Sequence, residues 1–120
     1  MEKVNIYNKF LKVKDYWDPK IVGELNDQHI KLVKVLGKFI WHKHQHEDEM
    51  FLVWKGNIKM ELEDKTLELG EGEFIIIPKG VKHRAIADHE AQLLLFEPAT
   101  TINTGDTKSR QYTVEEPDKI

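Results

Sequence analysis

The chain has 120 residues, of which 40% are apolar, so it is long enough for one domain with its own hydrophobic core. Charged residues make up 32% of the chain, but their signs are mixed and the formal net charge is -3, which argues against a nucleic-acid partner. The lack of cysteine excludes disulfides and thiolate metal sites, and no apolar run is long enough for a signal peptide or a membrane span. We therefore expect a cytoplasmic protein with no membrane partner.

The N-terminal segment predicts a short helix. Ile6 and Phe10 recur at helical spacing within residues 5–14. Pro19 ends any helix there, because the residue before a proline disfavours the helical conformation. Residues 1–20 are therefore expected to form a helical or extended arm that precedes the first strand.

Between residues 21 and 98, short apolar runs alternate with glycine or acidic turns, with Gly37 and Asp88–Glu90 among the expected turns. Short strands at this spacing predict an all-β sandwich or barrel. Residues 99–120 are polar and rich in turn formers, which predicts a C-terminal arm or tail. The expected strands are Ile21–Leu25, Ile30–Leu36, Phe39–His44, Glu49–Lys55, Ile58–Leu62, Thr66–Leu69, Phe74–Pro78, His83–Ala87 and Gln92–Glu97.

The histidines are concentrated in one short stretch, Trp-His-Lys-His-Gln-His, with another at position 83. On a strand, His42 and His44 would point to the same face, because residues two apart share a face. Glu49 opens the next strand after an acidic turn, so its carboxylate can face the same pocket. If His83 joins them, three imidazoles and one carboxylate suit Mn, Fe, Co, Ni, Cu or Zn and leave coordination positions open.

These residues also resemble a known pattern. The chain contains Gly37-x4-His42-x-His44-x4-Glu49-x6-Gly56, which resembles the first cupin motif, and Gly72-x5-Pro78-x-Gly80-x2-His83, which resembles the second. The flanking sequence is similar to that of small one-domain cupins often labelled mannose-6-phosphate-isomerase-like.

The resemblance implies a double-stranded β-helix, or jelly-roll barrel, over residues 21–98. It also implies that His42, His44, Glu49 and His83 bind one divalent transition metal ion, Zn, Mn, Fe, Ni or Cu, at the mouth of this barrel. The isomerase label is an analogy of fold and does not predict an activity.

Other polar residues near the motif are expected to play smaller parts. We expect His46 to be exposed, although its spacing from His44 leaves open a contact near the metal. Glu47 and Asp48 are expected to be solvated turn acids, and Arg84 should point away from the metal. No general base is evident beyond the ligands, with His46 a weak candidate.

Inward-facing ligands would leave an outward-facing apolar patch of Phe39, Trp41, Met50, Leu52 and Trp54. We expect a second subunit to cover this patch in a homodimer, because isologous dimers are the commonest assembly. The alternative is a monomer covered by its own N-terminal segment, through Phe10, Leu11, Tyr16 and Trp17.

Two functions remain open. The first is a metal-dependent enzyme that acts on a small polar molecule by isomerisation or by oxidative cleavage. The second is a non-catalytic module that binds or senses a small ligand in a pocket lined by Ile40, Phe51 and Val53. A metal-free structural barrel is the least favoured, because the converging polar groups would have no partner.

Overall fold

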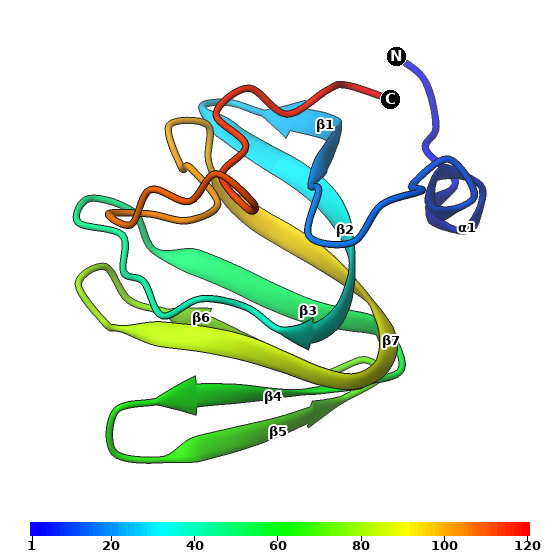
Figure 1. Ribbon diagram of the computed structural model, residues 1–120. Coiled ribbons are helices and arrows are strands. Elements are labelled where there is room, and N and C mark those ends of the chain that lie inside the picture. Colours follow the sequence, from blue (N-terminus) through cyan, green and yellow to red (C-terminus); the bar gives the residue numbers. More distant parts are fainter.

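The computed structural model describes residues 1–120 and shows an antiparallel double-stranded β-helix, or jelly-roll barrel, with a short N-terminal helix, as predicted (Figure 1). No helix has the length and apolar character that crossing a membrane would require. The elements are α1 (Ile6–Phe10), β1 (Lys20–Leu25), β2 (Gln28–Lys38), β3 (Glu49–Lys55), β4 (Asn57–Leu62), β5 (Thr66–Gly70), β6 (Phe74–Ile77) and β7 (His83–Pro98).

The long strand β7 organises the barrel, because it pairs with β2, β3 and β4. Its first residue, His83, pairs with Leu62 of β4, and its later residues lie between β2 and β3. Along its second half the side chains alternate between buried and half-buried positions, with Leu93, Leu95 and Glu97 all buried. Glu97 therefore points into the barrel, in phase with core leucines.

The expectation of two strands separated by a turn at Asp88–Glu90 is wrong, since β7 runs through this region without interruption. The pairing with β2 shifts here, from Val35 opposite Ala91 to Gly37 opposite Ala87, so the polar residues form an exposed bulge. Gly37 lies within β2 rather than in a turn, and its φ of 86° is one that glycine adopts without strain. An exposed bulge and a turn are both rich in polar residues, which explains why a turn was predicted at Asp88–Glu90.

The expected strand Phe39–His44 is also wrong. Residues 39–48, called the ligand loop from here on, are irregular, with only an isolated bridge between His42 and His83. The loop is held by a few scattered backbone hydrogen bonds rather than by a ladder. Phe39 N donates to Ala85 O (3.0 Å), His42 and His83 exchange a reciprocal pair, and Gly80 N donates to His44 O (2.8 Å).

Both arms pack on the barrel near β1 and β2, and Ile120 packs against the same small cluster as Phe10 and Val13. Helix α1 is shorter than residues 5–14, and Phe10 and Val13 pack on Leu32 of β2 with Leu94 beside them. Residues 99–120, the C-terminal arm, cross back over the ligand loop and return to β1, where Ile120 N donates to Ile21 O (3.0 Å) (Figure 1). The arm is thus ordered and packed on the barrel.

Candidate metal centre

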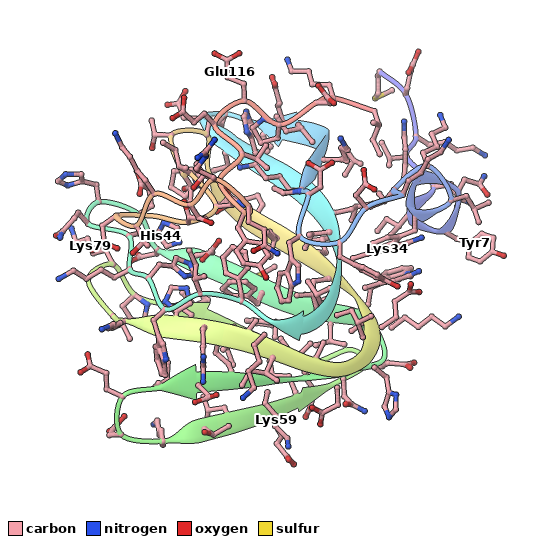
Figure 2. All side chains as sticks on the ribbon, in the orientation of Figure 1. Tyr7, Lys34, His44, Lys59, Lys79 and Glu116 are labelled. Atoms are coloured by element: carbon pink, nitrogen blue, oxygen red, sulfur yellow. The ribbon has the colours of Figure 1, made fainter.

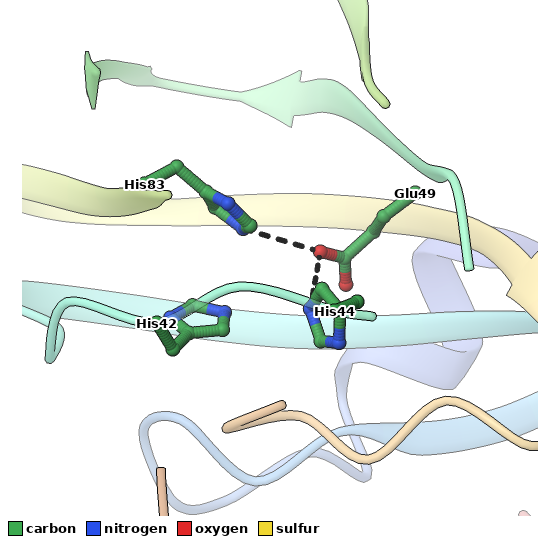
Figure 3. Close-up of side chains that lie close together, drawn as sticks. All are labelled: His42, His44, Glu49 and His83. Atoms are coloured by element: carbon green, nitrogen blue, oxygen red, sulfur yellow. Dashed lines mark ion pairs between the residues drawn. The ribbon is translucent and has the colours of Figure 1, made fainter. Parts of the chain in front are cut away.

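All four predicted residues lie together in the barrel interior. His42 and His44 come from the ligand loop, Glu49 is the first residue of β3, and His83 is the first residue of β7 (Figure 3). One ligand atom from each residue lies within 4.8 Å of those of the others, and all four side chains are buried. The sequence placed these residues together correctly; that they bind a metal ion is proposed below.

Backbone carbonyls orient two of the imidazoles. His42 Nδ1 lies 2.9 Å from the Ile40 carbonyl oxygen, and His83 Nδ1 lies 2.8 Å from that of Val81. Because a carbonyl can only accept, each Nδ1 must carry the proton and donate it. The Nε2 atom of each ring is then left with a free lone pair, which is the form that binds a metal ion.

Glu49 lies against the other two rings. Its Oε1 is 3.1 Å from His44 Nε2 and 3.5 Å from His83 Nε2 (Figure 3). Burial alone would raise the pKa of Glu49, but its pairing with His44 and His83 outweighs burial and holds the pKa well below the ordinary value. Burial would lower the pKa of His44, but the pairing with Glu49 raises it overall.

His42 behaves differently from its neighbours. Burial, and next the nearby His83, lower its pKa to about 4. His42 is therefore neutral at pH 7, which is the protonation state that a metal ligand needs.

Several polar atoms at the centre have no hydrogen-bond partner. They are His44 Nδ1, His44 Nε2, Glu49 Oε1 and His83 Nε2, and all are buried. An unsatisfied buried polar group costs about 1–3 kcal/mol, so convergent ones point to a missing partner. A cation would satisfy one nitrogen of each ring and the carboxylate oxygen together, so the residues fit a divalent metal ion.

The C-terminal arm braces the ligand loop. Asp106 N donates to Lys43 O (3.0 Å), and Lys43 N donates back to Asp106 Oδ1 (3.1 Å). Gly105 of the arm lies so close to the ligand loop that an added Cβ would be 2.2 Å from Lys43 O and 3.2 Å from His44 Nδ1. The position of His44 therefore depends on a segment some sixty residues later in the chain.

A cavity of about 40 Å³ adjoins His42, Glu49 and His83. Trp17 and Phe39 stack against each other in its wall, with ring centroids 4.8 Å apart. Apart from Glu49 and the two histidines, the lining residues are Trp17, Pro19, Val33, Val35, Phe39, Phe51, Ala85, Leu93, Leu95 and Asn103.

Three predictions about apolar residues need correction. Phe39 is buried in the cavity wall rather than facing outward, because the ligand loop lacks the alternation of a strand. Trp17 closes the same cavity instead of covering the outer face. Phe51 lines the cavity as predicted, whereas Ile40 and Val53 do not, Val53 being part of the core.

Residues near the motif behave largely as predicted. His46 is exposed and stays outside the cluster. Arg84 points away, pairing with Glu61 (3.1 Å) and lying over the Trp41 ring. Asp48 is exposed, but its Oδ1 accepts from Lys79 N (2.9 Å) and so ties the ligand loop to the turn before His83.

Two buried charged residues next to the centre were missed. Lys31 of β2 and Glu97 of β7 are each 2% exposed, and Lys31 Nζ lies 3.3 Å from Glu97 Oε1. Burial, and then the neighbouring Glu49, raise the pKa of Glu97 well above its ordinary value, although Lys31 opposes the shift. The phase of Glu97 with Leu93 and Leu95 was a signal in the sequence that it faces inward.

Comparisons with known proteins agree with this geometry. A family model described as "Cupin domain" matches residues 31–97. The uncharacterized protein YdbB of Bacillus subtilis is 36% identical over 64 residues, which are 52% of this chain and only 57% of YdbB.

Two solved structures match more of the chain. A cupin-2 domain containing protein from Shewanella frigidimarina is 39% identical, with a TM-score of 0.78 over 79% of this chain and 93% of that chain. Protein NMB1881 from Neisseria meningitidis is 30% identical, with a TM-score of 0.75 over 81% of this chain and 99% of that chain. The family match spans more than half of the sequence and includes all four residues of the centre, so the chain belongs to the cupin family.

Proposed function

We propose that His42, His44, Glu49 and His83 bind one divalent transition metal ion and that the function of the protein depends on this ion. The observation that carries the proposal is the convergence of four buried ligand atoms, several of which have no hydrogen-bond partner. Three imidazoles and one carboxylate suit Mn, Fe, Co, Ni, Cu or Zn. When bound, the ion would supply a Lewis acid or redox centre with positions left for a small molecule.

The residues that line the cavity indicate which class of small molecule it would bind. Its walls are aliphatic and aromatic, and Glu49 is the only acidic or basic residue among them besides the two histidines. Asn103 is engaged elsewhere, donating from Nδ2 to Tyr112 O (2.7 Å) and accepting at Oδ1 from Val114 N (2.8 Å). A phosphate group would therefore meet no cationic side chain, and we favour an uncharged molecule with an apolar body and an oxygen that reaches the metal.

The chemistry on such a molecule would be isomerisation or oxidative cleavage that depends on the metal. A non-catalytic binding or sensing role is the second candidate. The observation that favours it is the lack of any free acid or base in the cavity wall apart from the proposed ligands.

Elemental analysis of protein purified without a metal-binding tag tests the metal proposal. We expect near-stoichiometric transition metal in the wild type and a loss of most of it in His44→Ala. His46→Ala is the matched control, because His46 lies in the same stretch but is exposed and outside the cluster. No metal in the wild type, even after soaking with divalent ions, would refute the proposal.

Hydroxyacetone and its phosphate ester test the ligand class, because they differ only in the charged group. We expect hydroxyacetone to change the visible absorption of Co²⁺-loaded protein and its phosphate ester to do so at least tenfold more weakly. A stronger response to the phosphate ester would contradict the assignment of an uncharged ligand.

The outer face of the barrel supports a homodimer. Met50 pairs with Ile76, and Leu52 pairs with Phe74, so these side chains are neighbours on β3 and β6. Phe74 and Ile76 are more than half exposed, although both are large apolar residues. Because α1 packs over Leu32 and Leu94 instead, we propose that a second copy covers the surface formed by β3 and β6.

A further inference from the structure

Lys31 and Glu97 form a buried ion pair that the proposed metal centre does not itself use. Both side chains are 2% exposed, and Lys31 Nζ also lies 3.4 Å from the Thr101 carbonyl oxygen, which accepts its hydrogen bond. Charged residues are seldom buried so completely, because their desolvation is costly unless a partner compensates it. Replacing a buried ion pair with apolar residues of similar volume is often neutral or stabilising, so stability alone does not explain this pair.

The position of the pair relative to the centre is set by strand register. Met50 of β3 is opposite Phe96 of β7, so Glu49 and Glu97 are the next cross-strand neighbours. Both are buried in the inner face of the barrel. Glu97 thus stands between Lys31 and the carboxylate that lies against His44 and His83.

Lys31 reduces the electrostatic cost of burying Glu97 next to Glu49. Two carboxyl groups facing one another in a buried site repel when both are ionised. The ammonium group of Lys31 compensates the Glu97 carboxyl, which lets Glu97 remain packed against Glu49. Groups that hydrogen bond to a metal ligand without touching the ion commonly fix the orientation of that ligand and its affinity for the ion.

We propose that Lys31 and Glu97 are positioning residues that hold the Glu49 carboxylate in place for metal binding. This inference rests on the proposed metal function. The pair acts through Glu49 and does not touch the ion. Its removal should therefore weaken metal binding without unfolding the barrel.

Two nearly isosteric double variants test the proposal, and neither leaves a buried charge without a partner. In Lys31→Met/Glu97→Leu both polar groups are replaced by apolar ones, so the metal-free protein should unfold at the wild-type temperature or above. We expect its dissociation constant for Zn²⁺, measured by competition with a chelator, to rise about 10–100-fold. The visible spectrum of the Co²⁺ form should change as well, because it reports ligand geometry.

In Lys31→Met/Glu97→Gln an amide can still hydrogen bond to Glu49, so we expect it to recover most of the lost affinity. Lys59→Ala/Asp88→Ala removes an exposed ion pair between β4 and β7 and should keep wild-type affinity. Equal affinity and Co²⁺ spectra in the wild type and the Met/Leu variant would overturn the positioning role alone. Failure of the wild type to bind any metal would overturn the proposed function and this inference with it.

Discussion

At the scale of single residues, protonation is the property that the fold controls most tightly. His42 and His83 are kept with a free Nε2 by the carbonyls of Ile40 and Val81, two residues earlier in each case. His44 has no such carbonyl and instead lies against Glu49. A proton therefore competes with a metal ion mainly at His44, whose pKa is raised, and not at His42.

The low pKa of His42 predicts how the stability of the metal-free protein depends on pH. An unfolded histidine titrates near its ordinary value of 6.5, whereas folded His42 resists protonation down to about 4. Between these values the unfolded chain binds more protons, so the free energy of unfolding falls as the pH falls from about 6.5 to about 4. The contribution of His42 is fully present above this window and amounts to about 3 kcal/mol.

Urea denaturation of metal-free protein between pH 4 and pH 7 measures this contribution. We expect His42→Gln to lose much of the pH dependence across the window, while His46→Gln, at an exposed position, keeps the wild-type profile. The assignment would be wrong if the profile of His42→Gln had the wild-type slope.

At the scale of elements, the ligand loop depends on the C-terminal arm. The loop has no ladder of its own, and the reciprocal bonds between Lys43 and Asp106 join it to the arm. Gly105 makes this approach close, because any Cβ there would collide with Lys43 O.

Gly105→Ala should therefore push the arm away from His44 and weaken Zn²⁺ binding by about tenfold, the lower end of the range for lost support of a ligand. Gly72→Ala is the matched control: its φ is also positive, at 82°, but an added Cβ would meet nothing within 4 Å. Gly72→Ala should lose about 1 kcal/mol of stability from backbone strain, and Gly105→Ala should lose more, because its Cβ also collides with Lys43 O. Only Gly105→Ala should lose metal affinity in chelator competition, and equal affinity in the two would refute the bracing role of the arm.

At the scale of the whole molecule, the outer face is covered only in part. The N-terminal segment packs on β2 and β7 through Phe10 and Val13, while Phe74 and Ile76 on the edge strand β6 stay exposed. Tyr7 on α1 also projects from the surface, away from β3 and β6 (Figure 2). Isolated exposed residues are ordinary, whereas the neighbouring ones on β3 and β6 are the basis of the proposed dimer.

Sedimentation measures whether this surface joins two copies. We expect the wild type to sediment at twice the monomer mass of 14.1 kDa and Phe74→Lys/Ile76→Lys to sediment as a monomer. Tyr7→Lys, also at an exposed apolar residue, should leave the dimer intact. A monomeric wild type would contradict the homodimer.

Local patterns in the sequence predicted an all-β sandwich or barrel, and the resemblance to the cupin motifs implied the barrel and the clustered residues. Alternation such as that of Ile58–Leu62 reports a strand with one buried face, and this signal does not depend on which strand lies alongside. The spacing from His42 to Glu49 and the later His83 likewise matched a family pattern, and the four side chains do converge.

Only the tertiary structure decided what surrounds these residues. Phe39 and Trp17 meet because an irregular loop and the N-terminal arm pack together, and neither has a periodicity that predicts its contacts. The pair of Lys31 and Glu97 and the contact of Gly105 with Lys43 join residues more than sixty positions apart. Such contacts depend on strand register and on the path of the arms, which are set by packing of the whole chain rather than by neighbours in the sequence.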